Sequence, residues 1–128
     1  MSVLDELVAG AVEDQRSREN NVPLAEVKRM AFEASAPIDV RQWLKKADGI
    51  PVIAEIKRAS PSKGHLSDIP DPAALAREYE QGGASAISVL TEGRRFLGSL
   101  EDFDKVRAAV RIPVLRKDFI VTEYQIWE

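Results

Sequence analysis

Residues 51–57, PVIAEIK, decide the fold of this 128-residue chain, together with the loop SPSKG at residues 60–64. A short run of aliphatic and β-branched residues predicts a buried strand, and the Ser/Pro/Gly composition after it predicts a loop. A helix then begins after Asp71, with Pro72 at its first position, and it ends at Gly82-Gly83. Strand, loop and helix in this order are the beginning of a βαβ unit.

The rest of the second half repeats this pattern. Residues 85–90 and 112–116 predict two more strands, with a helix between them that Ser99 caps. Nearly continuous apolar strands that alternate with helices indicate an α/β fold with a parallel sheet. A doubly wound sheet and a (β/α)8 barrel both fit. No G-x-G-x-x-G motif follows the first strand, which argues against dinucleotide binding.

The first half predicts helices alone. Ser2 and Asp5 resemble a capping box before one helix, a second helix follows Pro23, and a third begins near Asp39. The turn signal Asp48-Gly49 ends this section. We therefore expect a helical extension over residues 1–49 and a strand-helix region over residues 50–128, where Thr122 and Gln125 begin one more helix.

Composition excludes several classes of function. The net charge is −3, so no global positive field attracts nucleic acid. The chain has no cysteine and one histidine, which excludes thiolate and His-rich metal sites. No apolar run reaches the roughly 18 residues that cross a membrane, and the N-terminus lacks the pattern of a signal peptide. We expect a cytoplasmic protein.

Charged residues follow each predicted strand, at the edge where barrel enzymes build their active sites. Glu55 and Lys57 are two residues apart on the first strand and share a face. Lys117, after the third strand, is expected to share a face with Phe119. A salt bridge at a strand end is the simpler explanation of the first pair. Two lysines at one edge, however, predict a cationic mouth that suits a phosphorylated, carboxylated substrate.

Other candidate contacts lie in the loops. Phe96 and Phe119 could form an apolar wall for a planar ring, or could be ordinary packing residues. Ser60, Pro61 and Ser62 could contact a ligand or form a simple turn. We expect His65 to be a surface residue.

Four segments resemble the indole-3-glycerol-phosphate synthase family. Residues 52–62 (VIAEIKRASPS) resemble its first-strand signature, and the others follow in order: residues 87–92 (ISVLTE), 96–100 (FLGSL) and 112–121 (IPVLRKDFIV). The helical extension is also similar to the one that covers the barrel mouth in this family. The resemblance implies a (β/α)8 barrel of the TIM type.

The resemblance also implies roles for these residues. Lys117 matches the general acid, Lys57 the lysine near the substrate carboxylate and phosphate, and Glu55 the acid that orients them. Ser60, Pro61, Ser62, Phe96 and Phe119 match substrate-pocket positions. The implied reaction converts 1-(2-carboxyphenylamino)-1-deoxyribulose 5-phosphate into indole-3-glycerol phosphate, carbon dioxide and water. It needs no cofactor and no metal.

Such a barrel has eight strands in about 250 residues, whereas this chain has three predicted strands in 128 residues. We therefore expect a partial barrel that is inactive alone, with open sheet edges that favour self-association or a partner carrying the other strands. The complete enzyme is expected to be a monomer. Two alternatives stay open: a non-enzymatic half-barrel that associates with a partner, and a phosphoribosylanthranilate isomerase type of enzyme. The second would be expected to use a cysteine, which this chain lacks.

Overall fold

A computed structural model describes all 128 residues, which form two compact units. The helical unit consists of Met1–Ala36 and Phe119–Glu128. The sheet unit consists of Pro37–Asp118. None of the helices in either unit has the length and apolar character that a bilayer span requires.

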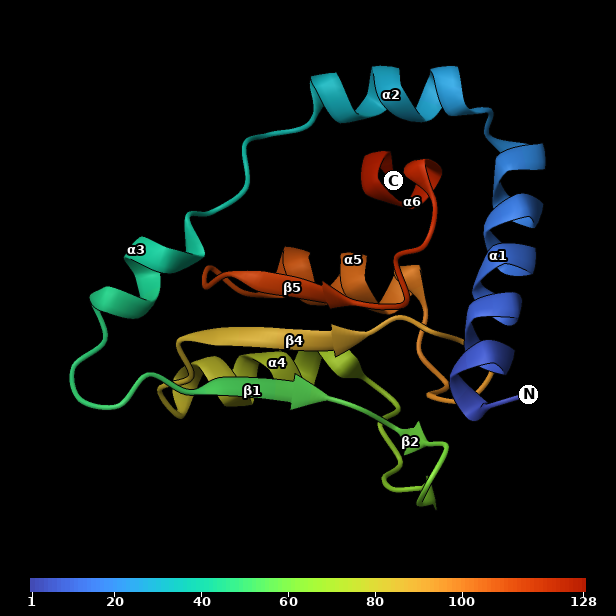
Figure 1. The fold of residues 1–128 in the computed structure, drawn as a ribbon. Coiled ribbons are helices and arrows are strands. Elements are labelled where there is room, and N and C mark those ends of the chain that lie inside the picture. The colour runs from blue at the N-terminus through green and yellow to red at the C-terminus, as the bar shows by residue number, and fades with distance from the viewer. The chain divides into compact units, whose positions relative to one another are not determined.

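The sheet unit contains three parallel strands, β1 (Ile53–Ile56), β4 (Ala86–Leu90) and β5 (Val114–Lys117). Figure 1 shows them side by side in the order β1-β4-β5. The predicted parallel sheet is thus confirmed. Chain order and spatial order agree, whereas a doubly wound sheet contains a point where the strand order reverses. The observed order therefore favours winding of the barrel type.

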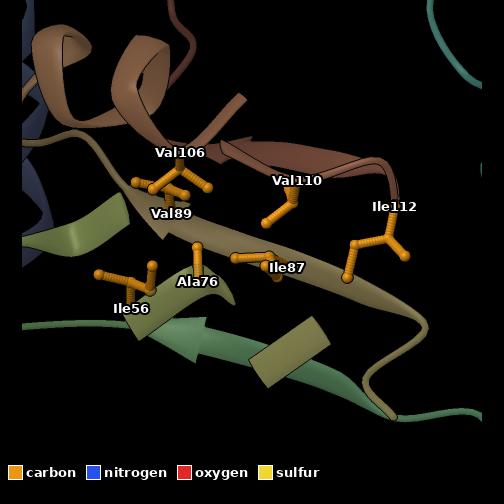
Figure 2. Packing of buried hydrophobic residues seen from close by; sticks show 7 residues of the cluster. All are labelled: Ile56, Ala76, Ile87, Val89, Val106, Val110 and Ile112. Carbon is orange, nitrogen blue, oxygen red and sulfur yellow. The ribbon is translucent and has the colours of Figure 1, made fainter. Parts of the chain in front are cut away.

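Two helices cover one face of this sheet, α4 (Pro72–Gln81) and α5 (Leu100–Ala109). The predicted caps are confirmed: Asp71 accepts a hydrogen bond from the amide of Ala74 at 3.1 Å, and Ser99 accepts one from Asp102 at 3.0 Å. Figure 2 shows the apolar core between helices and sheet, which consists of Ile56, Ala76, Ile87, Val89, Val106, Val110 and Ile112. This core fixes the strand ends against the helices.

The opposite face of the sheet carries a different set of side chains. Register pairs Glu55 with Ser88 and Ser88 with Leu115, so these three residues point away from α4 and α5. Ile53 and Leu115 are 54% and 56% exposed. We call this side the open face; it carries the polar groups described below.

One element of the sheet unit differs from the prediction. Residues 60–64 were expected to form only a loop, but Ala59–Ser60 (β2) and Gly64–His65 (β3) pair as a short antiparallel hairpin. Gly64 has φ +66°, a backbone conformation that glycine adopts at little cost. The helix α3 (Val40–Lys45), predicted to begin near Asp39 and capped by that residue, also belongs to this unit, and Trp43 packs against the core.

The helical unit contains α1 (Val3–Asn21), α2 (Leu24–Glu33) and α6 (Glu123–Trp127). The predicted capping box at Ser2 is present, and the helix predicted to begin at Thr122 also begins with a capping box. Distant parts of the chain meet here, because the Tyr124 hydroxyl donates to the carbonyl of Val22 at 2.8 Å. Arg18 Nη2 donates to Glu128 Oε2 at 3.0 Å. These bonds hold α6 against α1 and the start of α2.

Candidate active site

Glu55 is the centre of a polar cluster on the open face of the sheet. Its Oε1 lies 3.3 Å from Lys57 Nζ, and its Oε2 lies 2.9 Å from Lys117 Nζ. Ser88 Oγ donates to the same Oε2 at 3.1 Å. One carboxylate thus joins two ammonium groups, which lie at or directly after the carboxyl ends of β5 and β1, and the hydroxyl of Ser88 in the middle of β4. We call Glu55, Lys57, Ser88 and Lys117 the carboxylate cluster.

The contact between Glu55 and Lys117 is the strongest evidence that this cluster is more than an ordinary salt bridge. A pair two residues apart, such as Glu55 and Lys57, also fits an ordinary strand-end salt bridge. Lys117, in contrast, follows Glu55 by 62 positions and arrives on another strand. Its side chain remains 53% exposed, so its ammonium group is accessible from the solvent side. The two predicted lysines are therefore brought together at one sheet edge, with the carboxylate between them.

The surroundings of Glu55 act on its pKa in opposite directions. Partial burial raises the pKa, because it disfavours the charged carboxylate. Hydrogen bonds and charge attraction from Lys117, with smaller contributions from Lys57 and Ser88, outweigh burial and hold the pKa below its ordinary value. The carboxylate is therefore ionised at neutral pH and keeps both lysines in its field.

Backbone contacts fix the strands that carry this cluster. The Tyr79 hydroxyl on α4 donates to the carbonyl of Glu55 at 3.1 Å. The amide of Thr91 donates to the carbonyl of Lys117 at 3.0 Å, beyond the end of β4. Thr91 Oγ1 also donates to Asp118 Oδ2 at 2.8 Å. The lysine positions are thus set by the sheet and its first covering helix.

The remaining predicted contact residues lie in different places. Ser60 is half-buried in β2, and its Oγ accepts from the amide of Lys63 at 3.2 Å. Pro61 and Ser62 are exposed in the hairpin turn. Phe96 is half-buried in the loop after β4. The ligand roles of these four residues stay predictions.

Phe119 belongs to the helical unit, where its carbonyl accepts from Gln125 Nε2 at 2.8 Å. That Lys117 and Phe119 share a face stays a prediction. β5 ends at Lys117, so strand alternation does not extend to residue 119. A ligand role for Phe119 stays a prediction.

A family model described as Indole-3-glycerol phosphate synthase matches residues 4–128. The chain belongs to this family. Curated relatives named Indole-3-glycerol phosphate synthase include those of Mycolicibacterium gilvum, 63% identical over 127 residues, Beutenbergia cavernae, 58% over 128, and Leifsonia xyli subsp. xyli, 56% over 128. These alignments cover 99–100% of the chain and 46–49% of the relatives. The chain therefore spans about half the length of these relatives.

The sequence alone did not identify two further residues that contact Glu55. Ser88 hydrogen-bonds Glu55, and its signal was present: it is the one hydroxyl inside the apolar run 86–90. Tyr79 on α4 holds the backbone of Glu55 through its hydroxyl. Both contacts depend on register and on helix placement, which periodicity does not specify. No group of three acidic, histidine or cysteine side chains gathers as a metal site.

Proposed function

We propose that this chain supplies the first three strands and helices of an indole-3-glycerol phosphate synthase (β/α)8 barrel, with residues 1–49 as the helical extension over its mouth. The observation that carries the proposal is the pairing of Lys57 and Lys117 with one carboxylate, at the carboxyl edge of a parallel sheet. Barrel enzymes assemble their sites at this edge from several strands. The family match and the sequential strand order support the same assignment.

The proposed substrate is 1-(2-carboxyphenylamino)-1-deoxyribulose 5-phosphate. The ring carbon that carries the carboxylate attacks the ketone carbon, and Lys117 donates a proton to the ketone oxygen. This step forms the new carbon–carbon bond and leaves an iminium-type cation beside the carboxylate. Carbon dioxide then departs, and the bonding electron pair that it leaves behind neutralises the cation. The substrate thus supplies its own electron acceptor, and the proposal needs no cofactor.

The last step is loss of water. Lys57 protonates the hydroxyl group formed in the first step, water leaves, and release of one carbon-bound proton completes the indole ring. Glu55 holds both ammonium groups in place through this sequence, because it contacts each of them. Precise placement of proton donors and reacting carbons is the contribution that the protein makes.

Substitution of the two lysines tests these roles. The test uses a fused enzyme, in which residues 1–128 replace the matching segment of the Mycolicibacterium gilvum relative. We expect Lys117→Ala to lower kcat by about 10²–10⁴-fold with a small change in KM, the loss typical of a general acid. Lys57→Ala is expected to damage both kcat and KM.

Lys105→Ala is the matched control, because Lys105 is exposed on α5 and pairs with the exposed Glu101 one helical turn away. It should leave both constants unchanged. Small and equal effects of Lys57→Ala and Lys117→Ala, similar to those of the control, would contradict the assignment of roles.

A second candidate is a half-barrel that binds a partner chain without catalysis. The exposed Ile53 and Leu115 on the open face favour it, because apolar side chains on a sheet face are usually covered. Mixing the 128-residue chain with the remaining segment of the Mycolicibacterium gilvum relative separates the two functions. Restored ring closure favours the enzyme, whereas a complex without turnover favours the association module.

A further inference from the structure

Glu92 is a buried carboxylate that the proposed reaction does not use. It follows β4 after Thr91 and is 5% exposed. Its Oε1 accepts a hydrogen bond from the amide of Arg94 at 2.8 Å. Its Oε2 accepts from the amides of Arg95 at 2.7 Å and Phe96 at 2.9 Å. Three consecutive backbone N–H groups thus converge on one side chain, and the loop at residues 93–98 is wound around it.

Independent contacts hold the far end of the same loop. The amide of Gly98 donates to the carbonyl of Glu92 at 2.8 Å, which closes the loop on itself. Arg58 Nη1 donates to the carbonyl of Leu97 at 3.2 Å and also binds Asp102 in the first turn of α5. Leu97 has φ +57°, a left-handed conformation that costs free energy for a residue with a branched side chain. Such a conformation persists only where the surroundings hold it.

We propose that Glu92 is a positioning residue that fixes Phe96 as a preformed wall for the aromatic ring of the substrate. This inference rests on the proposed function. Phe96 is connected to Glu92 through its own amide, so the carboxylate sets the path of the backbone that carries the phenyl ring. A wall ordered before binding costs less conformational entropy when the ligand arrives. Glu92 therefore acts on aromatic recognition and contacts neither phosphate nor the reacting carbons.

Both carboxylate oxygens of Glu92 are needed as acceptors in this arrangement. A glutamine has the same shape, but its amide nitrogen carries hydrogens and cannot accept from a backbone N–H. Glu92→Gln therefore leaves at least one of the three amides facing another donor. Glu101→Gln is the matched control, because Glu101 is exposed on α5 and pairs with Lys105 across one helical turn.

The first measurement is amide hydrogen exchange in the 128-residue chain. Glu92→Gln should accelerate exchange at Arg94, Arg95 and Phe96 by about tenfold or more, whereas amides of β1 and β4 keep their rates. Glu101→Gln should change none of these rates. Unchanged exchange at all three loop amides in Glu92→Gln would overturn the inference. If Glu92→Gln does not fold, Glu92→Asp is used, whose shorter carboxylate reaches fewer of the amides.

The second measurement uses the fused enzyme and two probes, 2-aminobenzoate for the aromatic site and inorganic phosphate for the phosphate site. Glu92→Gln should weaken 2-aminobenzoate binding and raise KM by about fivefold or more, with phosphate binding within about twofold of the unsubstituted enzyme. Equal weakening of both probes would indicate general damage and overturn the inference.

A double-mutant cycle with Phe96→Leu tests whether Glu92 acts through Phe96. If it does, Glu92→Gln adds little further loss of 2-aminobenzoate affinity once Phe96 is replaced. Full additivity would overturn the inference. Absence of turnover in the unsubstituted fused enzyme would instead refute the proposed function, and with it the aromatic ligand named here. The exchange measurement separates the two failures, because it needs no substrate.

Discussion

At the scale of the residue, Glu55 determines the chemistry of the open face. It gathers two lysines and Ser88 around one carboxylate, although Ser88 lies within β4, Lys117 ends β5 and Lys57 directly follows β1. Both lysines attract the negative charge, and together with Ser88 they lower the pKa of Glu55 more than partial burial raises it. A carboxyl group whose pKa is lower in the folded chain stabilises the fold wherever it is ionised.

This pKa shift predicts how the effect of Glu55→Gln on stability depends on pH. Above the ordinary glutamate pKa of about 4.3, the unsubstituted chain has the full stabilisation from its ionised Glu55. As pH falls through the lower folded-state pKa, this contribution disappears, and the free energies of unfolding of the two proteins should converge. Urea unfolding at pH 7, 5 and 3 measures the difference. A difference that widens as pH falls would contradict the prediction.

At the scale of the element, the loop after β4 leaves no room for a side chain at Gly98. A Cβ atom built there would lie 1.9 Å from the carbonyl oxygen of Leu90, which is backbone and cannot turn aside. We expect Gly98→Ala to lower the free energy of unfolding by about 1–3 kcal/mol, the usual cost of overpacking. Thermal or urea unfolding measures this loss.

Gly93→Ala is the control within the same loop. Its Cβ would meet the carbonyl oxygen of Gly98 at 3.5 Å, an ordinary contact distance, so the change should stay within about 0.5 kcal/mol. Equal losses of stability for Gly93→Ala and Gly98→Ala would contradict the prediction, because the close approach to Leu90 exists only at Gly98.

Elements with a strong local signal could be predicted from the sequence. Asp71 and Ser99 identified the starts of α4 and α5 because a cap needs only a few neighbouring residues. The hairpin of β2 and β3 could not be predicted, since strands of two residues are too short for any periodic pattern. For Lys117, the sequence predicted a position at the same sheet edge as Glu55 and Lys57, but not the contact with Glu55 itself. The hydrogen bond from Ser88 to Glu55 could not be predicted, because it depends on the register between β1 and β4, which the sequence alone does not provide.

At the scale of the whole molecule, the two faces of the sheet differ in how far they are buried. Ile87 lies in the core and is fully buried, so Ile87→Ala should cost about 2–5 kcal/mol. Leu115 lies on the neighbouring strand but faces outward, and Leu115→Ala should change the stability of the 128-residue chain by at most about 0.5 kcal/mol.

The same substitution should become costly in the fused enzyme. If the open face is the interior of a closed barrel, Leu115 is packed among other strands there, and Leu115→Ala should cost about 2–5 kcal/mol. Urea unfolding of both proteins makes the comparison. An equally small effect of Leu115→Ala in the fused enzyme would mean that this face stays uncovered, contrary to a barrel.

Lys57 and Arg58 are neighbours in sequence, yet they serve opposite sides of the sheet. Lys57 reaches the carboxylate of Glu55, whereas Arg58 binds Asp102 of α5 together with the carbonyl groups of Ile69 and Leu97. Deletion of a single residue within β1 would reverse these directions, sending the guanidinium to the open face and the ammonium toward the helices. The length of this short strand is therefore as constrained as its composition.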